Sequence, residues 1–179
     1  MLNNKKHFDI LTPMSDFHRV SRRVAEVDDF ETEIGYWVKV TKDGAVNHFD
    51  GDGAANTDKG VSVVCLSSSK RATNGLSLYE TNDVKVGSVT CINTPGIRIS
   101  AGEDYFATGI DTAATDALWV PEDGASYNVG VMLGVMTDID NAGKLEMVGV
   151  GEFGNAIITG IDHEARIIEY MIILDRPNA

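Results

Sequence analysis

The sequence predicts an all-β protein, an antiparallel β-sandwich or barrel with an N-terminal arm and one short helix. From Tyr36 onward, short runs of apolar and β-branched residues alternate with turns rich in Gly, Asn and Asp. These runs recur at a spacing of roughly ten residues, which is typical of sandwiches and barrels. The chain also contains 18 glycines and only 4 prolines, a composition that suits many tight turns.

The first part of the chain has a different character. Residues 1–14 show no periodic pattern and predict an extended arm. Ser15 can cap a short helix, and an acidic cluster that begins at Asp28 should end it, because negative charge at a helix C-terminus opposes the helix dipole. The apolar residues with helical spacing are Phe17, Val20, Val24 and Val27. We therefore assign residues 1–35 to the arm and helix, and residues 36–179 to the β body.

Within the body, residues 36–40 and 45–49 flank a Gly-containing turn and predict a hairpin. Residues 93–96 (Asn-Thr-Pro-Gly) predict another turn. The segments 127–137 and 166–174 are apolar on both faces apart from Glu169, so we expect each to be covered on both sides. Further strands are predicted at residues 61–66, 76–80, 84–92, 97–101, 145–151 and 155–161.

The two cysteines, Cys65 and Cys91, both lie inside apolar, β-branched runs. In such surroundings a thiol behaves as a small hydrophobic side chain. Two isolated cysteines provide neither a zinc-ligand spacing nor a CxxC redox pair. The sequence therefore favours two buried free thiols over a disulfide.

The charge of the chain is unevenly distributed. The net charge is −12, of which residues 1–71 (10 Lys/Arg, 11 Asp/Glu) contribute −1 and residues 72–179 (5 Lys/Arg, 16 Asp/Glu) contribute −11. An acidic body disfavours nucleic acid and anionic membrane as partners. No apolar run is long enough to span a bilayer or to serve as a signal peptide, so we expect synthesis and residence in a cytoplasm. Basic residues near the N-terminus fit either a solvated helix face or a surface that docks on an acidic partner.

Two motifs that suggest ligand sites are better explained as turns. Residues 149–154 spell GxGxxG, but β-branched residues follow where a dinucleotide site needs a helix, and Glu152 would place negative charge beside the phosphates. The acidic loops at residues 50–58 and 138–146 resemble calcium loops. Both lack the bidentate Glu at the twelfth position, and both lie between predicted strands. We therefore expect no cofactor and no metal.

Catalytic patterns are also missing from the sequence. There is no GxSxG elbow, and the four histidines have no paired spacing; an HExxH that would begin at His163 has Ile167 at its second histidine position. Trp37 and Trp119, with Tyr36, either form an aromatic binding surface or belong to the core, and aromatics in half-buried strands favour the core. The sequence predicts a structural or binding protein rather than an enzyme.

The organisation as a whole, an N-terminal arm (residues 1–24) followed by a Gly-rich, acidic β body, resembles the capsid decoration, or head cement, proteins of tailed bacteriophages. Residues 33–49 and 97–109 are similar in character to the short strands and glycine turns of the β-barrel cement proteins. The resemblance implies a virion structural protein, made in the host cytoplasm and located on the capsid surface. It also implies a homo-oligomer, a trimer, that binds the major capsid protein and stabilises the assembled head shell.

In this interpretation the arm contacts the capsid. The expected contact residues are Phe8, Phe17, Arg19, Arg22 and Arg23. Two alternatives stay open on the same β body. One is a tail, neck or receptor-binding structural module of a phage, and the other is a trimeric β-barrel nucleotide hydrolase, for which the sequence shows no nucleotide-contacting motif.

Overall fold

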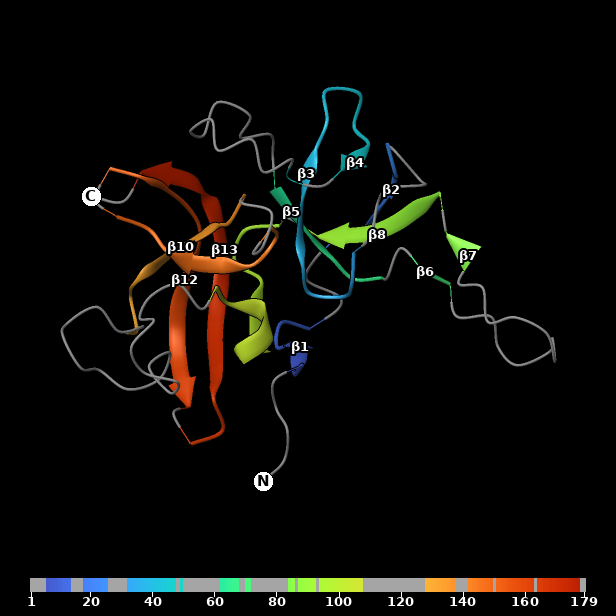
Figure 1. Cartoon of the computed structure of the whole chain (residues 1–179). Coiled ribbons are helices and arrows are strands. Elements are labelled where there is room, and N and C mark those ends of the chain that lie inside the picture. Colours follow the sequence, from blue (N-terminus) through green and yellow to red (C-terminus); the bar gives the residue numbers. More distant parts are fainter. Residues whose placement is uncertain are drawn as a thin grey trace, which may run out of the picture.

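The structure, a computed structural model, confirms the all-β fold of a sandwich or barrel type (Figure 1). It describes residues 6–13, 18–25, 32–47, 49, 62–67, 70–71, 84–85, 87–92, 94–107, 128–137, 142–149, 151–162 and 164–177. Within these residues the regular elements are strands, together with one short 3₁₀ helix, η2 (Glu103–Tyr105). No helix in this part of the chain is long and apolar enough to cross a membrane.

The larger sheet, called sheet A, has six antiparallel strands. Its order is β1 (Phe8–Ile10), β9 (Arg98–Gly102), β13 (Ile167–Pro177), β12 (Phe153–Asp162), β10 (Met132–Val135) and β11 (Leu145–Met147). Strands β12 and β13 form a long hairpin whose register shifts at two β-bulges, between Gly154 and Ala156 and between Ile158 and Gly160. Bulges increase strand twist, so this ribbon is curved rather than flat.

The second sheet, sheet B, has five strands, in the order β2 (Val20–Arg23), β8 (Ser88–Ile92), β5 (Ser62–Cys65), β3 (Trp37–Val40) and β4 (Val46–Asn47). Its two end strands meet, because Val24 bridges Val46 and the N–H of Ala25 donates to the Val46 carbonyl at 2.9 Å. Sheet B therefore curls into a small barrel. A separate ribbon pairs β6 (Lys70–Arg71) with β7 (Val84–Lys85).

Two apolar clusters follow from the alternation of side chains along the strands of sheet B. Trp37, Val64 and Ile92 face sheet A and join the main core between the sheets. Their neighbours on the other face line the interior of the barrel. The buried residues of that interior are Val24, Val38, Val46, Val63, Cys65, Val89 and Cys91.

The predicted hairpin at residues 36–49 is confirmed by the antiparallel pairing of β3 with β4. Its turn is closed by the N–H of Thr41, which donates to the Ala45 carbonyl at 2.8 Å, and by Gly44 with φ of +80°. The predicted turn at residues 93–96 includes Gly96 with φ of +90°. The strands on either side of it belong to different sheets, so this turn carries the chain from sheet B to sheet A.

The predicted helix is wrong over the residues that the structure describes. Val20–Arg23 form strand β2, which pairs with β8, because cross-strand hydrogen bonding outweighs a short local pattern. In a strand, Val20 and Val24 lie on one face, but only Val24 reaches the barrel interior, and Val20 is 40% exposed. The other residues of the helix prediction (Ser15, Phe17, Val27) lie outside the described residues, as do the predicted strand at 76–80 and Trp119.

The double-sided burial that we predicted for residues 127–137 and 166–174 is seen in part of the first segment: Met132 and Leu133 of β10 are 7% and 0% exposed, whereas Val129, in the turn before β10, is 65% exposed. In β13, Ile168, Tyr170 and Ile172 are buried against the core. On its opposite face, Ile167, Met171 and Ile173 are only half-buried. That face of sheet A therefore keeps some apolar surface in contact with solvent.

Candidate functional site

The N-terminal segment is attached to sheet A as an edge strand. The N–H of Leu11 donates to the Arg98 carbonyl at 2.9 Å, and the N–H of Gly102 donates to the His7 carbonyl at 2.8 Å. The N–H of Arg98 also donates to the Thr12 hydroxyl at 2.8 Å. Residues that we expected in a separate arm are thus part of the β body.

Phe8 belongs to a cluster of aromatic rings at this edge. Its ring centroid lies 5.6 Å from that of Tyr105, which lies 5.5 Å from that of Tyr36. Gly35, with φ of +93°, allows the close approach, since a Cβ there would lie 2.5 Å from the Tyr105 ring. Burial, assisted by the charges of Tyr36, Glu33 and Asp104, raises the pKa of Tyr105 to about 12. Phe8 is therefore a packing residue.

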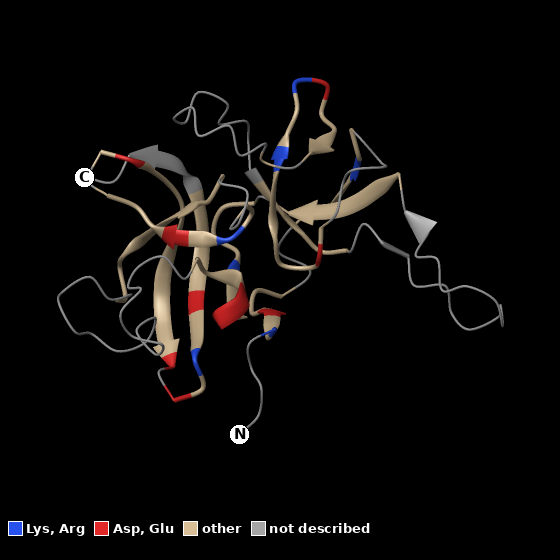
Figure 2. Cartoon of the chain, viewed as in Figure 1, with Lys and Arg blue, Asp and Glu red and all other residues tan. Residues whose placement is uncertain are grey.

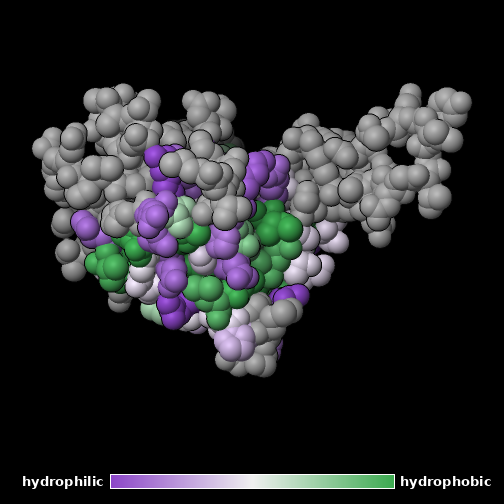
Figure 3. Space-filling model, turned by 90° about the horizontal axis from the view of Figure 1, so that it is seen from below, coloured by the Kyte–Doolittle hydropathy of each residue, from purple (hydrophilic) through white to green (hydrophobic). Residues whose placement is uncertain are grey.

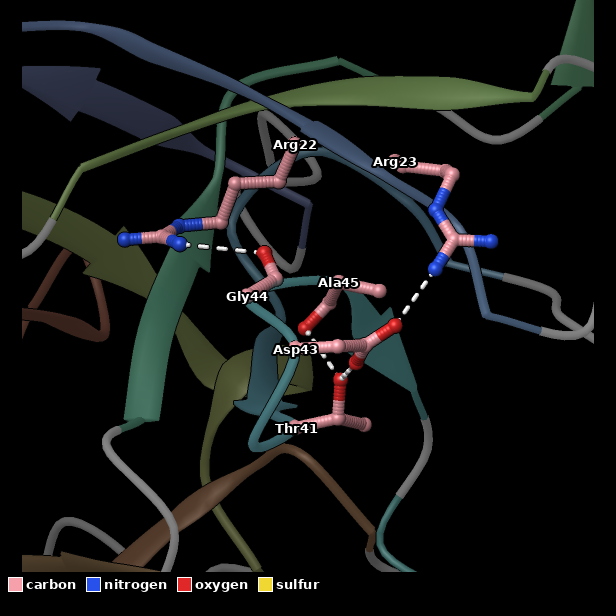
Figure 4. A network of polar contacts seen from close by, with 6 residues as sticks. All are labelled: Arg22, Arg23, Thr41, Asp43, Gly44 and Ala45. Atoms are coloured by element: carbon pink, nitrogen blue, oxygen red, sulfur yellow. Dashed lines mark hydrogen bonds and ion pairs between the residues drawn. The ribbon is translucent and has the colours of Figure 1, made fainter.

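Arg22 and Arg23 hold the turn between β3 and β4 (Figure 4). Arg22 donates from Nη1 to the Gly44 carbonyl at 3.1 Å, and Arg23 forms an ion pair with Asp43. The Asp43 carboxylate also accepts a hydrogen bond from the Thr41 hydroxyl. This hydrogen bond, with the Arg23 charge, holds the pKa of Asp43 below its ordinary value. We call these five residues the turn clamp.

The structure thus separates the residues predicted to contact a capsid. Phe8 lies at the edge of sheet A, while Arg22 and Arg23 lie on sheet B in the turn clamp. Arg19 is exposed just before β2, and the Arg23 side chain remains 67% exposed. Phe17 lies outside the described residues. The segment does not present these side chains together on one arm.

The outward face of sheet A carries a row of residues that we did not predict as a site. Phe8 and Ile10 pack on the core, so Leu11 points to the opposite face, where it is 40% exposed. The row runs from Leu11, the residue after β1, across β9, β13, β12 and β10 through direct cross-strand neighbours. Its members, the outer row, are Leu11, Arg98, Met171, Ile157 and Met132. The signal in the sequence was the second apolar face of residues 127–137 and 166–174.

The outer row contains a charged member, Arg98, and a second ion pair joins the turn before β13 to η2. Arg98 pairs with Glu169 across β9 and β13 at 2.6 Å, and the two side chains are 50% and 38% exposed. Arg166 pairs with Glu103 at 3.5 Å. Figure 2 shows acidic residues on β13, on η2 and at the turn that joins β12 to β13. On the face of the molecule seen from below, hydrophobic patches alternate with hydrophilic ones (Figure 3).

The GxGxxG segment forms a turn, as predicted. The N–H of Gly149 donates to the Glu152 carboxylate at 2.7 Å, and Gly151 has φ of +86°. The chain then enters strand β12, so no helix N-terminus is present to receive a pyrophosphate. Glu152 satisfies its own turn instead of approaching a ligand.

The second acidic loop contributes a structural glycine. Gly143 has φ of +83° and accepts a hydrogen bond at its carbonyl from the N–H of Trp37 at 2.9 Å. Trp37 is 3% exposed, which confirms its assignment to the core. Residues 50–58 and 138–141 lie outside the described residues. Among the described residues there is no group of three or more His, Cys, Asp or Glu side chains placed to hold a metal ion.

The histidines show no catalytic arrangement in the part of the chain that the structure describes. His7 shares a hydrogen bond with the Ser100 hydroxyl at 2.9 Å, and His18 is exposed. His48 and His163 lie outside the described residues. Cys65 and Cys91 are buried and free, as predicted.

No family model, no curated protein and no solved structure matches this chain. Its function must therefore be inferred from its own surfaces and from the sequence pattern described above.

Proposed function

We propose that this chain is a virion structural protein that decorates a capsid, binding the assembled head shell as a homo-oligomer and stabilising it. The observation that supports the proposal best is the outer row of sheet A. It offers partly exposed apolar side chains, Leu11, Ile157 and Met171, on a hydrogen-bonded sheet. A rigid sheet loses little conformational entropy on binding, which favours a contact surface.

The charges around the outer row favour a particular kind of partner. The Arg98–Glu169 pair lies within the surface, and the body of the chain is strongly acidic. Apolar contacts supply the binding energy, whereas charged groups orient the partners and set the association rate. We therefore expect the major capsid protein to meet this face with an apolar patch that carries Lys or Arg at its rim.

The positions of β1 and β2 determine how the proposal can be tested. Deletion of residues 1–25 would remove an edge strand from each sheet, and with it Val24, which is 2% exposed in the barrel. Such a truncated chain would lose capsid binding simply because it does not fold. Surface substitutions in the outer row avoid this ambiguity.

The test uses the full chain carrying Leu11→Glu and Met171→Glu, with Val129→Glu as the matched control. Val129 is 65% exposed and lies outside the outer row. Each variant is expressed during particle production in the cells that carry the gene, and heads are separated on a density gradient. We expect the wild type and the control to co-sediment with heads. The fraction of the double variant that is bound to heads should fall at least about tenfold, as happens when a central contact of an interface is removed.

Two results would contradict the proposal. One is wild-type protein that sediments apart from every head fraction. The other is a double variant that binds heads as the wild type does while its circular dichroism and melting temperature show a native fold. Light scattering on the same variants measures the oligomer; a trimer that persists in the double variant assigns the outer row to the capsid rather than to the subunit interface.

A further inference from the structure

The two cysteines face each other inside the barrel of sheet B. Cys65 on β5 and Cys91 on β8 are register partners, and their Sγ atoms lie 3.9 Å apart. Their exposed fractions are 0% and 1%. They are also the only two cysteines of the chain, so any disulfide within one molecule must join them.

Their position on the two strands suits a disulfide. At the next register position, the N–H of Leu66 donates to the Thr90 carbonyl at 2.7 Å. Because hydrogen-bonded and non-hydrogen-bonded pairs alternate along antiparallel strands, Cys65 and Cys91 occupy a non-hydrogen-bonded pair, where Cα atoms lie about 4.5 Å apart. This separation falls within the range that a disulfide requires, about 4.4–6.8 Å. The bond therefore needs side-chain rotation and little backbone movement.

We propose that Cys65 and Cys91 are a modification site that forms a reversible cross-strand disulfide by exchange with a low-molecular-weight disulfide such as oxidised glutathione. The thiolate of one cysteine attacks the reagent, forms a mixed disulfide and releases one reduced thiol. The second cysteine attacks the protein sulfur and releases the other. The protein loses two protons and two electrons, and the reagent becomes two thiols.

The surroundings determine which thiol ionises first. The hydrogen bond between the two sulfurs lowers the pKa of Cys91, and the Arg22 guanidinium acts in the same direction. The same hydrogen bond, together with burial, raises the pKa of Cys65. These directions favour the thiolate at Cys91, the thiol on which the Arg22 charge acts. Because both sulfurs are buried, the reagent reaches them during transient opening of the barrel.

The test measures how strongly the native fold favours the bond. Full-length protein is unfolded and reduced, then either refolded into glutathione buffers of graded ratio or kept in denaturant in the same buffers. Refolding from the open chain ensures that both thiols have been accessible. Alkylation of the remaining thiols and mass spectrometry give the oxidised fraction, and Cys91→Ser is the control that cannot form the bond.

We expect the native chain to be half-oxidised at a value of [GSH]²/[GSSG], the squared concentration of reduced glutathione divided by that of oxidised glutathione, at least tenfold higher than the denatured chain requires, which corresponds to about 1.4 kcal/mol. By linkage, the oxidised protein should then melt at a higher temperature than the reduced one. If the native and the denatured chain were half-oxidised in the same glutathione buffer, the proposal would be overturned. A lower melting temperature of the oxidised form would also overturn it, as would recovery of the cysteines only in mixed or intermolecular disulfides.

Discussion

The two apolar clusters of this protein are built from different side chains. Between the sheets, the fully buried residues include Tyr170, Phe106 and Leu133. Inside the barrel of sheet B, the buried residues among those that the structure describes are valines and cysteines. A barrel of few strands encloses little space, so only small side chains fit, whereas two facing sheets leave about 10 Å for large ones. The main core can therefore supply most of the stability, while the barrel depends more on how its ends are closed.

The two sheets also differ at their edges. In sheet B, the bridge of Val24 with Val46 and the turn clamp bring the end strands together. In sheet A the end strands β1 and β11 are three residues each and do not meet; Leu145 of β11 is bridged instead by Phe106, which follows η2. Short edge strands limit pairing with other chains, which is one way in which natural sheets avoid aggregation.

The largest expected effect comes from the main core. Phe106 is 0% exposed and packs edge-on against Tyr170, with ring centroids 6.3 Å apart. Phe106→Ala should lower the free energy of unfolding by about 3–5 kcal/mol. Val63→Ala in the barrel removes only two methyl groups and should cost roughly 2 kcal/mol. Chemical denaturation of both variants measures the difference, and a barrel variant that costs as much as the core variant would contradict this comparison.

The next effect tests the contact between the two sheets. A Cβ at Gly143 would lie 2.5 Å from the Trp37 carbonyl oxygen, at a φ of +83°. Gly130 has a similar φ, +92°, but open space around it. Gly130→Ala should therefore cost about 1–2 kcal/mol from backbone strain alone. Gly143→Ala should cost more than its control, because the backbone of β3 must also move. If Gly143→Ala and Gly130→Ala lowered the stability equally in thermal denaturation, the contact between Gly143 and Trp37 would be unimportant.

A smaller effect should appear at alkaline pH. The pKa of Tyr105 is raised to about 12 from 10.0, mainly by burial. The folded state thus holds this proton more tightly, so the stabilisation is fully present below pH 10.0 and is lost as the pH rises through about 12. The phenolate absorbance of the wild type minus that of Tyr105→Phe should show one phenol that titrates with a pKa of about 12. Titration of that phenol near 10.0 would contradict its burial.

The smallest effect concerns the turn clamp. The Thr41 hydroxyl and Arg23 lower the pKa of Asp43 from its ordinary 3.8. The clamp therefore stabilises the folded state above pH 3.8. This stabilisation is lost as the pH falls through the lower pKa that Asp43 has in the folded protein. Thr41→Val should move the Asp43 pKa upward, as followed by NMR of the carboxyl carbon, with Arg23→Gln giving a smaller shift. An unchanged pKa in Thr41→Val would contradict the contacts described.

The accuracy of the sequence predictions depended on the range of the interactions involved. The hairpin at residues 36–49 was predicted because its turn residues and strand alternation lie within a few positions of each other. The helix at Ser15 was predicted from equally local spacing, yet Val20–Arg23 pair with β8, almost seventy positions away. The predicted contact residues were likewise separated, since Phe8 packs on sheet A and Arg22 on sheet B.

The sequence alone determined the all-β class, the buried thiols, the core position of Trp37 and the turn at residues 149–154, because alternation and turn chemistry are local properties. Only the tertiary structure decided which strands became neighbours. In the folded chain, sheet B closes into a barrel, the outer row lies across sheet A, and Cys65 lies opposite Cys91. Those arrangements depend on strand order and register, which are set by packing between segments far apart in the chain.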